Sequence, residues 1–207
     1  MNFSLCGQSI QFKPLFQDQS LASNKKYIFQ NDTLEIETLK FYISNVRFYN
    51  KEELVDTADK KYLLMDLKNP NSLTVAHRGK NFNTIKFSIG IDSIINVSGA
   101  LSGDLDPIKG MYWAWHSGYI NFKLEGKSKN CPARKNKFQF HIGGYEFPFN
   151  TLQEKEFKTN NTNAVIEIAL DKLFKQMDLS KEYEVMSPNR QAFEISKLFS
   201  TCFKLAK

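Results

Sequence analysis

Side chains that could carry chemistry are densest between Gly110 and Gly126. This stretch holds both tryptophans, Trp113 and Trp115, and one of the three histidines, His116. Large amphipathic rings placed this closely serve either a packed β core or a binding site. On composition alone, the aromatic run is more typical of a core strand than of a site.

A second histidine, His141, lies in a predicted strand further along the chain. Copper needs only two or three imidazoles, and strands can supply them from distant positions. If residues 119–124 and 138–142 pair as a hairpin, His116 and His141 come within reach of each other, unless strand alternation turns them to opposite faces. On spacing alone, a satisfied and half-buried strand histidine is the favoured interpretation of His141. The third histidine, His77, is a further candidate ligand, but its polar surroundings are typical of a surface loop.

Three aspartates, Asp92, Asp104 and Asp106, lie in an irregular, glycine-containing stretch that ends at Gly110. Calcium takes several oxygen ligands from one loop of this kind, so these residues are a candidate hard-cation site. The segment from Asp104 to Pro107 fits equally well a turn whose carboxylates accept backbone hydrogen bonds. The turn is the favoured interpretation.

Signatures of other chemistries are absent from the sequence. It contains no GxSxG, no CxxC and no glycine-rich phosphate loop, which argues against a common serine hydrolase, a structural zinc site and a nucleotide-binding motif. Two of the many carboxylates could form a glycosidase pair, but no spacing selects them.

The elements that must position these residues are mainly strands. Apolar residues alternate with period two through several segments, with one slip near Thr38 and a bulge expected at Ser44-Asn45. The predicted strands are Ser9–Phe16, Tyr27–Phe29, Thr33–Phe48, Tyr62–Leu67, Asn83–Ile91, Tyr112–Leu124 (broken at Ser117-Gly118), Phe138–Ile142, Tyr145–Phe149, Glu154–Phe157 and Asn163–Leu170. Lys51–Lys61 is expected to be a charged surface connection.

Near the C-terminus, the spacing of apolar residues changes from the pattern of a strand to that of a helix. Ser187-Pro188 offers a cap and a first-turn proline, and apolar residues then fall on one face of a helix predicted over Pro188–Leu205. We therefore predict an all-β chain: an antiparallel β-sandwich with a C-terminal amphipathic helix packed on it, as a single domain over residues 1–207.

The composition limits the kinds of binding partner that we expect. The net charge of +6 is moderate for 207 residues, and its basic run lacks interleaved base-stacking aromatics, so nucleic-acid binding is not expected. No apolar stretch approaches the roughly 18 residues that span a bilayer. The three cysteines, Cys6, Cys131 and Cys202, leave the pairing of any disulfide open. No secretory signal is visible before Cys6, so the chain is either cytoplasmic or begins downstream of its true start.

Several motifs occur in an order that resembles the MbnP-like family of exported copper-binding proteins, over about residues 9–205. They are Phe41–Phe48, Ile89–Asp92, Ser98–Pro107, Gly110–Trp115, Ser117–Tyr119, Lys123–Gly126, Phe140–Gly143 and Val185–Pro188. The resemblance implies a non-enzymatic β-sandwich, periplasmic or at the cell surface, that binds one copper ion.

The resemblance also implies a partner, a di-haem enzyme of the MauG and cytochrome c peroxidase type. In the characterised branch this partner oxidises a tryptophan to kynurenine, whose amine completes the copper site. Carried onto this chain, Trp113 and Trp115 are the candidates for modification and His141 is the best-matched ligand. Two features depart from the family pattern: His116 stands where a polar amide is usual, and Lys13-Pro14 stands in the first strand where a histidine is expected.

Two further functions are weighed against copper binding. A metal-free interaction module could recognise a protein or a glycan through the aromatic stretch. An enzyme with a carboxylate pair would need a cleft lined by acids with perturbed pKa values.

Overall fold

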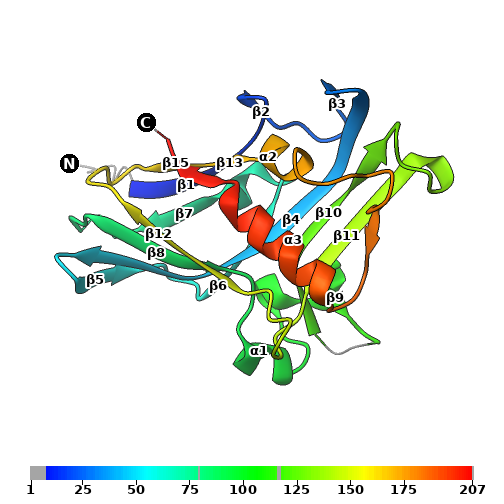
Figure 1. Cartoon of the computed structure of the whole chain (residues 1–207). Helices are drawn as coiled ribbons and strands as arrows, with labels where there is room; N and C mark the ends of the chain where they lie inside the picture. Colours follow the sequence, from blue (N-terminus) through cyan, green and yellow to red (C-terminus); the bar gives the residue numbers. More distant parts are fainter. Residues whose placement is uncertain (1–7, 79, 116–117, 207) are drawn as a thin grey trace.

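The computed structural model describes residues 8–78, 80–115 and 118–206. Within these ranges, the strands form two β-sheets (Figure 1). The first sheet contains β15 (Phe203–Leu205), β13 (Val165–Ala169), β1 (Gln8–Phe16) and β2 (Gln19–Ser20) in that order, with β7 (Thr74–His77) paired to β1.

The second sheet is larger and is organised around its longest strand, β4. Its order is β12 (Gln153–Lys158), β8 (Thr84–Ile89), β4 (Asp32–Asn50), β10 (Gly118–Ser128), β11 (Lys137–Gly143) and β14 (Glu184–Val185). Four shorter strands pair alongside: β3 (Lys26–Phe29), β5 (Glu53–Thr57) and β6 (Tyr62–Asp66) with β4, and β9 (Tyr112–Trp113) with β10.

Helical segments are short except for the last one. They are α1 (Ser93–Val97), α2 (Asp171–Phe174) and α3 (Arg190–Thr201), with 3-10 turns at Pro70–Leu73, Gly103–Leu105, Pro107–Lys109 and Arg134–Asn136. No helix in the described ranges has both the length and the apolar character needed to cross a bilayer.

The two sheets and α3 share one hydrophobic core. Phe12 of β1 meets Phe87 of β8 edge-on, with ring centroids 5.4 Å apart, so the sheets pack face to face. The ring of Phe199 in α3 stacks on Phe122 of β10 at 3.8 Å. Helix α3 therefore crosses the inner face of the second sheet (Figure 1), and the predicted all-β fold with a packed C-terminal helix is confirmed.

The pairing of the strands differs from the prediction in one respect. β1 pairs with β13, and β11 with β14, in parallel, so both sheets are mixed rather than purely antiparallel. Parallel neighbours need long connections, and the chain joining each of these pairs is long enough to provide one.

Both predicted irregularities of β4 are present. Its pairing with β10 shifts register next to Thr38. Its pairing with β8 shifts between Ser44 and Arg47, where Asn45 has a φ of 52°. An extra residue in one strand leaves the alternation of buried side chains offset on either side of it, and this offset made both sites visible in the sequence.

Four sequence predictions were wrong in detail. Lys51–Lys61 contains an edge strand, β5, and charged side chains are compatible with an exposed edge. Tyr145–Phe149 is a loop, because Pro148 has no N–H for a ladder and Gly144 has a φ of 131°.

The other two errors concern the start and end of the last helix. Asn189, not Ser187, caps α3, since its Oδ1 accepts from the backbone N–H of Ala192 at 2.8 Å. The helix ends at Thr201, and Phe203–Leu205 pairs with β13 as a strand instead of continuing it. Cys131 and Cys202 are both buried free thiols, whereas Cys6 lies outside the described residues.

Candidate functional site

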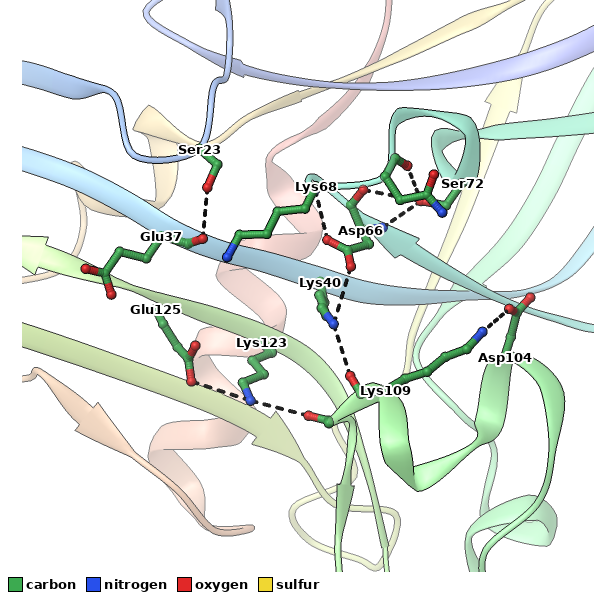
Figure 2. Close-up of polar contacts among 12 residues, drawn as sticks. Ser23, Glu37, Lys40, Asp66, Lys68, Ser72, Asp104, Lys109, Lys123 and Glu125 are labelled. Atoms are coloured by element: carbon green, nitrogen blue, oxygen red, sulfur yellow. Dashed lines mark hydrogen bonds and ion pairs between the residues drawn. The ribbon is translucent and has the colours of Figure 1, made fainter.

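The predicted hairpin of β10 and β11 is confirmed, and it places His141 directly opposite Lys123. The His141 side chain is largely buried, with the residue 8% exposed. Its Nε2 lies 2.7 Å from Oε1 of Glu125 on β10. Lys123 Nζ lies 3.4 Å from the same carboxylate oxygen (Figure 2), so the imidazole, the carboxylate and the ammonium form one cluster.

Glu125 is ionised throughout the neutral range. The hydrogen bond with His141 lowers the pKa of Glu125 to about 2, and Lys123 adds to this effect against the opposing effect of burial. An ionised carboxylate only accepts, so Nε2 of His141 is assigned the proton in this pair. In the neutral imidazole, Nδ1 then carries the lone pair.

Trp113 lies on the same face of β11 as His141. A Cβ added at Gly143 would stand 2.8 Å from Cζ3 and 2.9 Å from Cη2 of the Trp113 ring. Residues two apart on a strand share a face and are separated by roughly 6.6 Å. The indole of Trp113 therefore covers Gly143, one strand repeat along from His141.

The two tryptophans have different environments. Trp113 is 5% exposed and belongs to a small core cluster with residues that include Met111 and Tyr119. Trp115 is 67% exposed. The centroids of the two rings are 5.9 Å apart, at 47°, so a buried indole is adjacent to one that is open to solvent.

Two lysines attach the preceding loop to the outer face of the second sheet. Lys40 Nζ donates to the carbonyl of Lys109 at 3.0 Å, and Lys123 Nζ donates to the carbonyl of Gly110 at 3.3 Å (Figure 2). Gly110 has a φ of 72° and ends a 3-10 turn, which directs the chain into β9. This attachment brings Trp113 back over β11.

Buried amide side chains support the same region from inside. Asn121 Oδ1 accepts from the N–H of Ile91, and its Nδ2 donates to Thr151 Oγ1, both at 2.9 Å. Asn96 Oδ1 accepts from the N–H of Tyr119 at 2.8 Å. These bonds fix the positions of α1 and of the start of β10 without occupying His141.

The structure does not bring His77 to this cluster. His77 lies in β7 of the first sheet, whereas His141 lies in the second. His77 is thus a buried strand residue and not the surface-loop residue expected from its neighbours. Its Nε2 donates to the carbonyl of Thr162 at 2.7 Å, and its ring packs on Phe48 and Phe82. His116 lies outside the described residues.

The three aspartates are each engaged in local structure. Asp92 caps α1 and accepts from the Tyr62 hydroxyl. Asp104 binds Lys109 at 2.7 Å and Lys60 at 3.2 Å, and Asp106 caps the turn that follows it. In the parts of the chain that the structure describes, no three His, Cys, Asp or Glu side chains gather as a metal site.

Glu125 is the residue that the sequence reasoning overlooked. Its relation to His141 is a diagonal one across the hairpin, since Glu125 is directly opposite Gln139. The signal was present in the alternation of Lys123 and Glu125, which places both side chains on the face that His141 shares.

The comparisons with known proteins agree with this architecture. The sequence model of the family described as MbnP matches residues 7–187. No curated protein matches the sequence. Among solved structures, the fold is similar to that of MbnP from Methylosinus trichosporium, with a TM-score of 0.65 at 14% identity over 89% of this chain and 86% of that one. Since the family match covers most of its length, this chain belongs to the MbnP family.

Proposed function

We propose that this chain is an exported copper-binding protein, periplasmic or at the cell surface, that acquires or buffers copper rather than catalysing a reaction. The observation that carries the proposal is the arrangement on β11. His141 is held by Glu125 through one ring nitrogen, and Trp113 covers Gly143 on the same face.

The donor chemistry at His141 suits copper. Imidazole is a common copper ligand, and a ligating histidine usually donates its other ring N–H to a carboxylate, which fixes the orientation of the ring. Glu125 holds Nε2 in this way, leaving Nδ1 to bind the ion. Because His141 is the one histidine in this cluster within the described ranges, a complete site needs further donors. We assign these to His116 and to an oxidised tryptophan.

We further propose that a di-haem partner of the MauG and cytochrome c peroxidase type oxidises Trp113 to kynurenine. Kynurenine presents an aromatic amine, and Trp113 lies on the face of β11 that His141 occupies. Trp115 is the second candidate, because it is exposed and therefore accessible to a partner. With dioxygen or peroxide as the oxidant consumed at the partner, the indole loses one ring carbon as formate and the side chain gains one oxygen, so intact mass followed by peptide mapping identifies the residue.

The test is a competitive copper titration of the protein alone and of the protein produced together with its haem partner. His141→Ala is expected to weaken copper binding by at least about tenfold, since one of few ligands is lost. His77→Gln is the matched control, because a glutamine amide can keep the hydrogen bond to the Thr162 carbonyl. Equal affinities for wild type and His141→Ala in both preparations would overturn the proposal.

One observation favours a second candidate, a metal-free interaction module. Trp115 is exposed, as are Ile94 and Val97 of α1, and both α1 and β9 lie at the same end of the molecule (Figure 1). Such a surface suits a protein or a glycan. Under this alternative, Trp115→Ala abolishes partner binding, while His141→Ala changes neither partner binding nor copper binding.

A further inference from the structure

Arg47, in β4, forms no ion pair within the part of the chain that the structure describes. Its Nε is buried and has no hydrogen-bond partner among the described residues, and no acidic side chain in those ranges forms an ion pair with its guanidinium. Buried polar groups in folded proteins are nearly always hydrogen-bonded, and a partly buried cation without an anion is costly. The side chain is therefore suited to a partner from outside the chain.

Arg47 lines a pocket of about 450 Å³. Two short segments line it, Asn45–Arg47 of β4 and Thr57–Lys61 after β5. The irregular part of β4, between Ser44 and Arg47, lies in this lining. The N–H of Asn45 donates to the Lys61 carbonyl at 2.9 Å, and the N–H of Ala58 donates to the Val46 carbonyl at 3.1 Å. These bonds join the two walls and keep the pocket formed.

The lining is positively charged. Lys60 and Lys61 line the pocket together with Arg47. Their ammonium groups are held by Asp104 and Asp92, at 3.2 Å and 3.5 Å, which limits where they can move. The acidic residue of the lining, Asp59, is 78% exposed and faces Arg78 at 3.8 Å. It therefore does little to neutralise Arg47.

The cation opposite Arg47 on the neighbouring strand is already paired. Lys86 of β8 is opposite Arg47 in register, and its ammonium lies 2.9 Å from Glu156. Glu156 is thus paired with Lys86 and Asp59 with Arg78, and neither carboxylate forms an ion pair with Arg47. An anion bound beside Arg47 would meet a guanidinium whose Nε has no hydrogen-bond partner within the described residues.

We propose that Arg47, Lys60 and Lys61 form a binding site for a small organic anion that presents an oxyanion group, a carboxylate or a phosphate. Arginine recognises both groups with two parallel hydrogen bonds. The pocket is larger than a bare inorganic ion requires and falls within the range of small-molecule sites. Arg47 is seven residues along β4 from Lys40, roughly 23 Å on an extended strand. The site is therefore separate from His141 and does not depend on copper binding.

The test follows the Nε–Hε resonance of Arg47 in nitrogen-15-labelled full-length protein, assigned by its loss in Arg47→Lys. Glutarate and glycerol phosphate serve as the two probes, and sodium chloride of equal ionic strength controls for screening. We expect a saturable shift of this resonance with at least one probe. The probe that saturates at the lower concentration identifies the preferred group. The amides of Thr57–Lys61 should move with the same midpoint.

Arg47→Lys removes the planar fork but keeps a positive charge, and should weaken probe binding at least about tenfold, measured on the Thr57–Lys61 amides. Arg190→Lys, which alters an arginine outside the pocket, should bind like wild type. If Arg47→Lys does not fold, Lys61→Gln tests the same site and should weaken binding several-fold. Two results would overturn the proposal: shifts that chloride reproduces, or equal affinities for the variants and wild type. Either would show that the Arg47 guanidinium is hydrogen-bonded by water alone.

Discussion

The indole of Trp113 occupies the space in which a side chain at Gly143 would otherwise stand. A Cβ at Gly143 would lie 2.8 Å from the Trp113 ring and 2.5 Å from the Tyr119 carbonyl oxygen. Because Gly143 has no side chain, the ring of Trp113 from β9 can lie over β11. This contact connects the aromatic run at Trp113 with the strand that carries His141.

Gly143→Ala should therefore be strongly destabilising. The new methyl group meets backbone on one side and a buried ring on the other, so we expect a loss of about 2 to 3 kcal/mol in the free energy of unfolding. Gly118→Ala is the matched control, because its Cβ would stand 3.5 Å from the nearest atom, Asn96 Oδ1. Urea unfolding followed by tryptophan fluorescence measures both. Similar midpoints for the two variants would contradict the close packing of Trp113 on Gly143.

Glu125→Gln tests whether the carboxylate orients His141 for a metal. A group that hydrogen-bonds a metal-binding histidine typically contributes about 10- to 100-fold in metal affinity, so copper affinity should fall within that range while the fold persists. Glu37→Gln removes another carboxylate of the second sheet, one that binds Lys127 at 2.6 Å and not His141, and should leave affinity unchanged. A competitive copper titration measures the affinity of both variants. Equal losses in both variants would point to a general electrostatic effect.

The strands themselves were largely predictable because alternation is a local signal. The β10–β11 hairpin follows from two alternating segments joined by a polar loop, and the pairing of Lys123 with His141 lies within it. The bulges in β4 were visible for the same reason, as offsets in a regular pattern.

The site was less predictable, because its contacts join segments that the sequence does not connect. Trp113 reaches Gly143 only because β9 folds back on β10 and lysines hold Lys109 and Gly110. The burial of His77 depends on the pairing of β7 with β1, which lies more than sixty residues earlier in the chain. Alternation within a segment carries no information on such neighbours.

The loop before β9 should loosen in acid. Burial alone would raise the pKa of Asp104, but hydrogen bonds from Lys109 and Lys60 outweigh it and leave the pKa lowered. A lowered folded pKa means that the stabilisation is complete well above the unfolded value of about 3.9 and is lost as pH falls through the folded value. Asp104→Asn should cost about 1 to 2 kcal/mol at pH 7 and progressively less as the pH approaches 3.

Urea midpoints across this pH range test the effect of Asp104. Asp59→Asn is the control, because its mostly exposed carboxylate lies 3.8 Å from Arg78 and exposed pairs contribute little. A difference between wild type and Asp104→Asn that stays constant from pH 7 to pH 3 would show that the loss comes from packing and not from charge.

Cys202 should resist alkylation in the folded protein. Burial raises the pKa of its thiol to about 12, and the thiolate is the reactive form. In a Cys6→Ser background at pH 8, we expect iodoacetamide to modify Cys202 at least about a hundredfold more slowly in native than in guanidinium-unfolded protein. Ser102→Cys, at an exposed position in the loop before β9, provides a reactive control in the same background. Native modification of Cys202 at the rate of that control would mean that α3 opens readily from the sheet. The core contact between Phe199 and Phe122 would then be a weak one.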